Sequence, residues 1–218
     1  MKKLFFFFAT LFFCLPGFAQ LVQGSQLIGA RLGLGFQLEN SGVSYSDYNR
    51  VDWGSLGTEY GLSYYYLVTD KVGIGADVSY GDFDGGDLFV SSDKVSDRTR
   101  LFNTFLSARL TSNPSGVFRL YMPLGIGITT SHQHLHIDKG GTQYKNRATD
   151  TSLGWFAGAG FEFDFGRGSD WSMGLEARYN SFSVDTDRLT RDSPAAVKGV
   201  GNRRLSYMSF QLRVNKRF

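Results

Sequence analysis

The only three histidines of the chain alternate along one short segment, at His132, His134 and His136. If this segment is an extended strand, all three imidazoles lie on one face, roughly 7 Å apart, and Asp138 follows in the same register. Neutral imidazoles beside a carboxylate can bind zinc, copper or nickel. Three histidines on one straight strand cannot converge on a tetrahedral ion without a bend or a ligand from another loop. They are therefore candidate ligands only, and we expect neither a resident metal nor a cofactor.

Two other groups of polar residues resemble reactive or binding sites. Ser131 precedes His132, and a hydroxyl with an imidazole forms the nucleophile and base of many hydrolases. Neighbouring residues of a strand point to opposite faces, so these two side chains would not meet. Asp82, Asp84 and Asp87 resemble part of a calcium loop, but they lack the spacing and the distal glutamate of an EF-hand, which favours turn residues. We expect no enzymatic activity.

The elements that must position these residues are indicated by strict alternation of apolar and polar residues. In residues 28–38 the even positions are apolar and the odd positions are mostly glycine or polar. The same alternation recurs in seven further segments: 56–66, 72–81, 101–110, 118–129, 152–165, 171–180 and 206–218. Each is close to the roughly 9–11 residues that a tilted strand needs to cross a bilayer. The sequence therefore predicts eight strands.

Short and long connections alternate between these strands. The short ones, at 68–71, 112–116 and 166–170, have the composition of tight turns. The long ones, near 39–55, 82–100, 130–151 and 181–205, are polar. This alternation is typical of outer-membrane barrels, which have short periplasmic turns and long external loops. The predicted fold class is all-β, an eight-stranded antiparallel transmembrane β-barrel.

One face of the predicted strands is apolar except at Thr58, Thr104 and Lys216, and the other is rich in glycine and charge. A soluble barrel would turn the apolar face inward. However, the interior of an eight-stranded barrel is just wide enough to be filled by side chains, and so many large residues would overfill it. We therefore expect the apolar face to contact lipid. Aromatic residues at the strand ends predict two interfacial belts: Tyr64, Tyr66, Phe118, Phe163, Phe165, Trp171 and Phe218 near the short turns, and Tyr80, Trp155, Tyr179 and Phe182 near the long loops. Pro123, in mid-strand, predicts a bulge.

The opposite face predicts a charged lumen. Its charges away from the periplasmic end are Arg31, Glu59, Asp77, Arg109, Arg119, Glu162, Glu176, Arg178 and Arg213. Buried charges must be paired or solvated. Arginines and carboxylates in near balance favour mutual pairing around trapped water, which would plug the lumen. A narrow gated pore, whose selectivity the arginines would tune, is the alternative.

Residues 1–19 have the features of a secretory signal peptide. Lys2 and Lys3 precede an apolar run at 4–13, and small residues occupy Gly17 and Ala19. Cleavage would leave residues 20–218 as one barrel domain with four long external loops. Cys14, the only cysteine, would leave with the peptide, which excludes disulfides and thiolate metal sites. With 23 basic and 20 acidic residues, the chain offers no surface for nucleic acid.

The last predicted strand places Phe210, Leu212, Val214 and the terminal Phe218 on the lipid-facing side. This pattern resembles the C-terminal assembly signal of outer-membrane barrel proteins. Lys216 departs from it, although at the interface a lysine can snorkel. The chain as a whole is similar to the small OmpA- and OmpX-type, porin-like barrels. The resemblance implies insertion by the barrel assembly machinery and contact with lipid in the outer membrane of a Gram-negative bacterium.

The resemblance implies no single activity, because such barrels include structural, transport, adhesive and enzymatic proteins. We expect a structural or surface-interaction role with a plugged polar lumen. The alternatives are a narrow porin for small solutes, an outer-membrane lipid-modifying enzyme and a loop metal binder. Large apolar residues in the long loops could anchor an extracellular partner or cap the barrel mouth: Tyr45, Tyr48, Trp53, Leu88, Phe89 and Tyr144.

Overall fold

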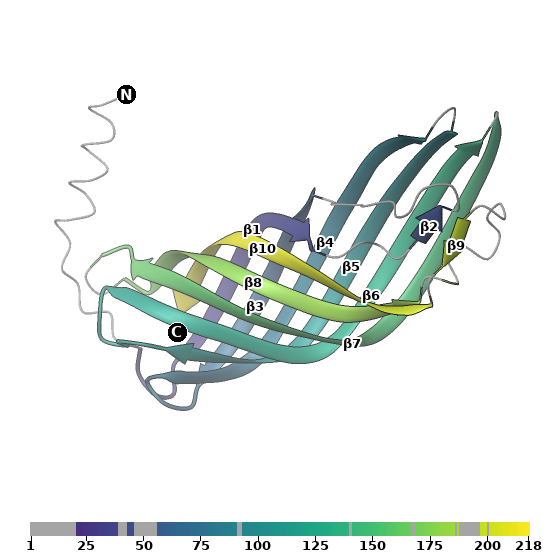
Figure 1. Ribbon diagram of the computed structural model, residues 1–218. Helices are drawn as coiled ribbons and strands as arrows, with labels where there is room; N and C mark the ends of the chain where they lie inside the picture. Colours follow the sequence, from purple (N-terminus) through teal and green to yellow (C-terminus); the bar gives the residue numbers. More distant parts are fainter. Residues whose placement is uncertain are drawn as a thin grey trace, which may run out of the picture.

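A computed structural model describes residues 21–38, 43–45, 56–90, 93–139, 141–166, 169–185, 187, 197–199 and 201–218. Eight antiparallel strands close into a barrel (Figure 1): β1 Gln26–Gln37, β3 Leu56–Leu67, β4 Val72–Val90, β5 Asp93–Thr111, β6 Phe118–Lys139, β7 Thr142–Asp164, β8 Trp171–Asp185 and β10 Asn202–Arg217. Two short strands, β2 Val43–Tyr45 and β9 Val197–Gly199, pair only with each other. The predicted eight-stranded barrel is confirmed. The predicted signal peptide lies outside the described residues.

Every neighbouring pair in the barrel follows the chain order except the closure, where β1 pairs with β10. The last residue takes part in this closure. The Gln26 amide donates to the Phe218 carbonyl at 3.1 Å, and the Phe218 amide donates to the Gln26 carbonyl at 2.9 Å. Lys216 lies beside this end, with its Nζ 5.4 Å from the centre of the Trp171 ring and 4.7 Å from that of the Phe218 ring. Its ammonium group therefore lies beside two aromatic rings of the predicted belt near the short turns, within the range of a cation–π contact.

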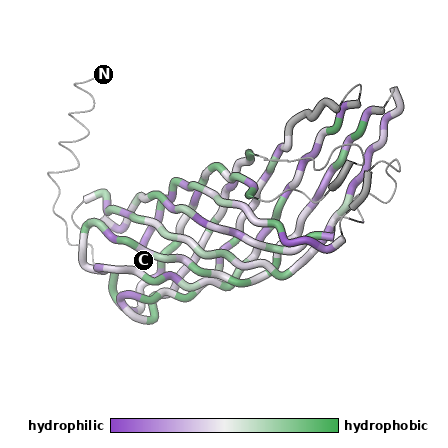
Figure 2. The backbone as a smooth tube through the Cα atoms, in the orientation of Figure 1, coloured by the Kyte–Doolittle hydropathy of each residue, from purple (hydrophilic) through white to green (hydrophobic). Residues whose placement is uncertain are grey.

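The apolar face of the strands points outward. Leu62, Leu106 and Leu153 are 63%, 75% and 69% exposed, whereas Glu59 and Arg109 on the opposite face are 0% exposed. Along the barrel wall the hydropathy alternates from residue to residue (Figure 2). This arrangement excludes the soluble barrel with an apolar interior. None of the described residues forms a helix long and apolar enough to cross a membrane.

Two of the four long connections fold as extended hairpins that continue the barrel strands. β4 and β5 stay paired as far as Val90 and Asp93, and β6 and β7 stay paired as far as Lys139 and Thr142. These outer hairpins, residues 82–90 with 93–100 and residues 130–139 with 141–151, project beyond the rest of the barrel rim (Figure 1). A strand can continue beyond the lipid even where its residues are polar. There, polar side chains on either face of the strand can form hydrogen bonds with water or with other side chains.

Two local expectations also need correction. Asp82 and Asp84 lie within β4 rather than in a turn, and the register shift in this hairpin falls between Asp84 and Gly86. Pro123 causes no bulge. Pairing of β6 with β7 is interrupted at Met122 and Pro123, but it resumes at Leu124 in the same register. The missing amide of Pro123 therefore removes ladder contacts on one side without displacing the strand.

Candidate functional site

All nine charged residues expected in the lumen lie inside the barrel, each at most 4% exposed. Between them they come from all eight barrel strands: Arg31 of β1, Glu59 of β3, Asp77 of β4, Arg109 of β5, Arg119 of β6, Glu162 of β7, Glu176 and Arg178 of β8, and Arg213 of β10. Antiparallel pairing at fixed register brings these residues together although they are distant in sequence. The lumen is therefore the main polar site of the described chain.

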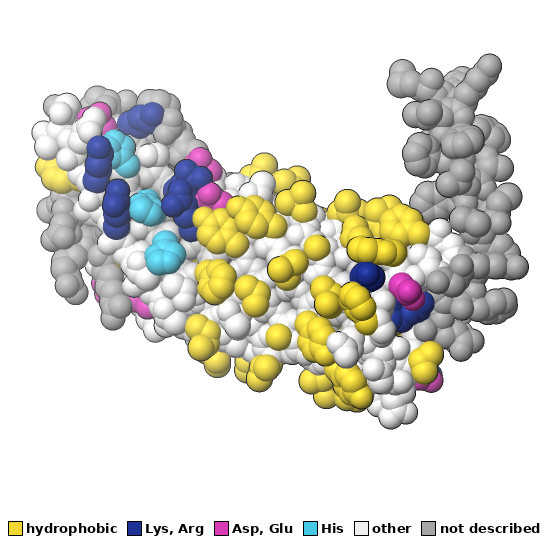
Figure 3. Space-filling view, turned by 180° about the vertical axis from the view of Figure 1, so that it is seen from behind, with side chains coloured by type: hydrophobic (Ala, Val, Ile, Leu, Met, Phe, Trp, Pro, Cys, Tyr) yellow, Lys and Arg dark blue, Asp and Glu magenta, His cyan; other side chains and the backbone are white. Residues whose placement is uncertain are grey.

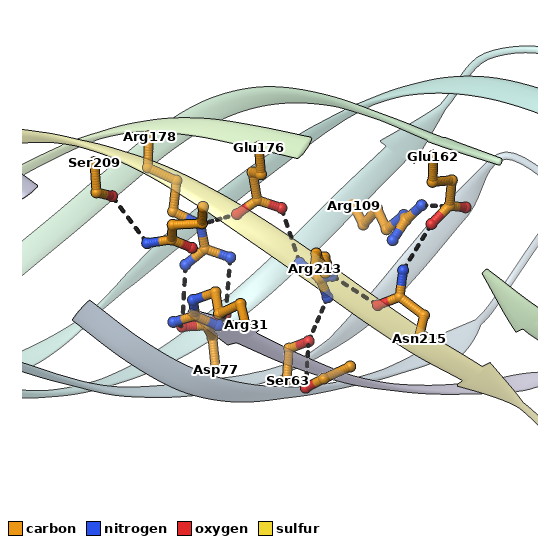
Figure 4. Close-up of polar contacts among 12 residues, drawn as sticks. Arg31, Ser63, Asp77, Arg109, Glu162, Glu176, Arg178, Ser209, Arg213 and Asn215 are labelled. Atoms are coloured by element: carbon orange, nitrogen blue, oxygen red, sulfur yellow. Dashed lines mark hydrogen bonds and ion pairs between the residues drawn. The ribbon is translucent and has the colours of Figure 1, made fainter. Parts of the chain in front are cut away.

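The first part of this lumen network centres on Asp77 (Figure 4). Arg31 donates to both of its carboxylate oxygens, at 2.6 and 2.5 Å. Arg178 donates to the same two oxygens, at 3.1 and 3.0 Å, and also contacts Glu176. Glu59 lies beside this group, where Arg31 and Arg178 act on its carboxylate.

The network continues through β10. Arg213 donates to Glu176 at 2.8 Å and to the Asn215 side chain at 2.7 Å. Asn215 in turn donates to Glu162 at 2.7 Å, so an uncharged amide joins two groups of ion pairs. Figure 4 shows these side chains meeting between the strands.

Glu162 is the acceptor at the far end of the network. The guanidinium of Arg109 lies 2.6 Å from its carboxylate and that of Arg119 lies 3.0 Å away. Arg119 also donates to Asp164 at 2.8 Å. Contacts are therefore continuous from Arg31 to Asp164, and two arginines share each of the carboxylates of Asp77, Glu162 and Glu176.

Aromatic rings that were not among the predicted lumen residues lie between these charges. The Arg109 guanidinium lies 3.8 Å from the centre of the Tyr121 ring, and that of Arg178 lies 4.2 Å from the centre of the Phe156 ring. Tyr65 is fully buried in the same interior. The inward position of Tyr65 could have been predicted from the sequence, because Tyr65 and Glu59 are an even number of residues apart in β3 and so point to the same face. Cation–π contacts of this kind stabilise desolvated arginines.

A second layer of the lumen, toward the outer hairpins, is apolar. We call it the aromatic layer; its members are Phe83, Leu101, Phe182, Val184, Leu205 and Tyr207. Phe182 was expected in the outer belt, but it lies inside at 4% exposure. Phe182 is separated by an even number of residues from Glu176 and Arg178 of the same strand, and it therefore points inward as they do. The Phe83 and Tyr207 rings meet edge to face at 5.0 Å between centres.

Inward-facing glycines make room for these large side chains. A Cβ at Gly61 would lie 2.6 Å from the Arg31 guanidinium, and one at Gly125 would lie 2.2 Å from the Phe156 ring. Both distances are too short for real atoms. The glycine content of the inner face is thus a packing requirement.

The histidines do not converge on one point. His132, His134 and His136 point outward from β6 and lie opposite three alternate residues of β7, Thr149, Arg147 and Lys145. Within the described part of the chain, no three His, Cys, Asp or Glu residues are grouped to bind a metal ion. Ser131 is buried on the inner face, whereas His132 is exposed and contacts Thr149 at 2.9 Å. Ser131 and His132 therefore do not form a nucleophile–base pair.

Some of the expected surface anchors are not described. Tyr48 and Trp53, and the side chains of Tyr45, Leu88 and Phe89, lie outside the described residues. Tyr144 is half-buried on β7.

The residues of the predicted assembly signal face the lipid. Phe210, Leu212 and Phe218 are exposed, and Val214 is partly exposed on the same side of β10. Their role in assembly stays a prediction.

The outer hairpins hold two acids with shifted pKa values. A bidentate hydrogen bond from Arg98, at 2.8 and 2.5 Å, lowers the pKa of Asp82. Burial on the inner face of β5 raises the pKa of Asp97 to about 8, and the nearby Asp84 carboxylate adds to this effect. The two hairpin faces therefore differ in electrostatic environment.

Comparison with known proteins agrees with this architecture. A family profile described as "Outer membrane protein beta-barrel domain" matches residues 5–218. The chain belongs to this family. Its barrel is therefore an outer-membrane barrel, with the apolar face in the lipid and the charged face in the lumen. Members of this family have structural, surface or transport roles. No curated protein matches the chain.

Solved structures of other outer membrane proteins resemble this family member in fold. The outer membrane protein OprG from Pseudomonas aeruginosa is 13% identical, with a TM-score of 0.54, over 91% of this chain and 98% of that one. The outer membrane protease OmpT from Escherichia coli is 8% identical, with a TM-score of 0.50, over 93% and 98% of the two chains. Identities this low show a common fold and nothing about activity.

Proposed function

We propose that the protein is a structural outer-membrane barrel with a closed lumen, whose outer hairpins serve surface interactions. The observation that carries this proposal is the continuous set of contacts from Arg31 to Asp164 across the lumen. A conducting pore needs side chains that face water along a continuous path. Here eight of the nine charged residues, all but Glu59, pair with one another instead.

The burial of the lumen supports the same proposal. Glu59, Asp77, Arg109, Glu162 and Asn215 are all 0% exposed, which leaves no water-sized space beside them. An ion that entered would have to separate existing ion pairs, and separating buried pairs is costly.

The aromatic layer would form a second barrier. Water and ions pass poorly through an apolar constriction. On the outer side of the charges the rings of Phe83 and Phe182 both pack against Tyr207, and all three residues are at most 4% exposed. Passage of a solute would require both layers to move.

Single-channel recording of the refolded protein in a planar bilayer tests the proposal. A mobility shift on boiling first establishes that the barrel is folded. We expect no discrete conductance steps from the wild-type protein. Reproducible steps whose size changes in Arg109→Ala would contradict a closed lumen and favour the narrow porin for small solutes.

A further inference from the structure

The outer hairpins carry basic residues on the face that continues the lipid-contacting surface. In Figure 3 the Lys, Arg and His side chains gather on the projecting end of the molecule, next to the band of hydrophobic side chains. We call this group the basic face; it comprises Arg98, Arg100, His132, His134, His136, Lys145 and Arg147. We propose that the basic face binds phosphate groups on the headgroups of glycolipids in the surrounding outer leaflet.

Strand pairing arranges the basic face in three rows. Arg100 lies beside His132 in the first row. Arg98, His134 and Arg147 form the second, and His136 with Lys145 forms the third. Each row is two residues farther along the strands, so all of them point in the same direction as the lipid-facing Phe102 and Ile128.

The height of these rows points to lipid headgroups. Two residues advance about 7 Å along a strand, which at a tilt of about 40° is about 5 Å of height. The first row therefore lies about 5 Å above the level of Phe102, and the third about 15 Å above it. Because the basic face points radially outward at this height, the membrane's own headgroups reach it without having to be captured from solution.

The extent of the rows favours a glycolipid over a phospholipid. The headgroup layer of an ordinary leaflet is only about 5–8 Å thick, half the difference between the full bilayer and its hydrocarbon core. The second and third rows extend beyond that layer. Phosphates borne on a larger saccharide headgroup would reach the height of Arg147 and Lys145.

The charges of the basic face are only partly neutralised within the hairpins. Asp82 binds Arg98 through two hydrogen bonds and lies 3.7 Å from Arg100. Asp84, beside Arg98 on β4, adds a second carboxylate. Lys145 and Arg147 are exposed on β7, away from these two acids, and the nearest acid of the same face is Asp138, which lies opposite Gln143 one row beyond His136. Arg147 can offer a phosphate two parallel N–H groups, and the histidines supply further donors.

The potential around His134 agrees with this assignment. Burial and the neighbouring Arg147, Arg100, His132 and Arg98 lower the pKa of His134. Positive charge therefore outweighs negative charge at the centre of the basic face, where an anion would be stabilised.

The proposal rests on the interaction role given to the hairpins and not on the closed lumen, so a conductance result does not affect it. The test reconstitutes the full chain in phosphatidylcholine bilayers containing a bisphosphorylated glucosamine-disaccharide lipid or its dephosphorylated counterpart. Native mass spectrometry after gentle extraction measures the lipid that stays bound. We expect wild type to retain more of the phosphorylated lipid than of the dephosphorylated one. In Lys145→Ser/Arg147→Ser the ratio of the two retained lipids should fall about fivefold for each charge removed.

Two controls separate binding from other effects. Lys71→Ser removes an exposed charge at the opposite end of the barrel and should leave the preference unchanged. Arg147→Lys keeps the charge and should keep most of the preference, and every variant must show the mobility shift of a folded barrel. Equal retention of the two lipids by wild type, or an unchanged preference in the double variant, would overturn the proposal. Displacement of the lipid by inorganic phosphate, but not by chloride at equal ionic strength, would also overturn it in favour of a soluble anion.

Discussion

Removing Glu162 should destabilise the barrel more than any substitution of a surface acid. Its carboxylate lies 2.6 Å from Arg109 and 3.0 Å from Arg119, and it accepts a hydrogen bond from Asn215 at 2.7 Å. Glu162→Ala leaves Arg119 with Asp164 but takes from Arg109 the carboxylate with which it pairs. Breaking a buried pair by removing one partner costs about 3–5 kcal/mol, because a desolvated charge stays behind.

Urea unfolding of the barrel in lipid vesicles, followed by tryptophan fluorescence, measures this cost. At a slope of about 2 kcal/mol per molar urea, the midpoint should fall by about 2 M. Asp170→Ala is the matched control, because Asp170 is 62% exposed and lies 3.5 Å from Arg217; it should cost less than about 1 kcal/mol.

A double variant separates the lost charge pair from lost packing. Arg109→Met/Glu162→Met replaces both charges with apolar groups of similar length, and such replacements are often neutral or stabilising. We therefore expect the double variant to be more stable than Glu162→Ala. A loss below about 1 kcal/mol in Glu162→Ala would refute the reasoning, because it would mean that Arg109 reaches water or another acid.

Three further predictions test other parts of the fold. Leu124→Arg, on the lipid face, should cost about 2–4 kcal/mol or prevent insertion, measured by urea unfolding and by the mobility shift on boiling. Gly61→Ala places a methyl group 2.6 Å from the Arg31 guanidinium and should cost about 1–3 kcal/mol in the same unfolding assay. Burial raises the pKa of Asp97 to about 8, so the folded hairpin binds this proton more tightly than the unfolded chain does. Hairpin stability should therefore fall as pH rises from about 4 to about 8, and Asp97→Asn should remove this dependence in proteolysis of the outer hairpins.

The barrel strands could be predicted from the sequence because lipid imposes a rule on each residue. A lipid-facing side chain must be apolar, and its neighbours in the strand point into the lumen. Alternation therefore identified both the strands and their faces, down to the inward position of residues such as Arg31 and Glu176. Beyond the lipid this rule ends. The extension of β4 through Asp84 to Val90 carries no comparable signal, so the length of the external connections allows extended hairpins but the sequence does not give their strand bounds.

The partners within the lumen could not be predicted for a different reason. Register parity gives the direction of a side chain but not its height in the barrel. That Arg178 of β8 meets Asp77 of β4 depends on the stagger of all the strands between them. The inward position of Phe182 needed only parity and was missed because its aromatic ring and its place near a strand end suggested a belt residue.

Because Phe182 lies inside the barrel, closure of the lumen would depend on the aromatic layer as well as on the ion pairs. If the ion pairs alone closed the barrel, neutralising Arg109 would open a path. The aromatic layer lies on the outer side of those pairs and contains no charge, so removing an arginine leaves it in place. A silent Arg109→Ala variant would then be expected even if the inner network had loosened. The inner network and the aromatic layer resist different perturbations, because salt and pH act on ion pairs whereas apolar packing is insensitive to both. A lumen closed by both layers, as we propose, would stay closed under a wider range of conditions than either layer would provide.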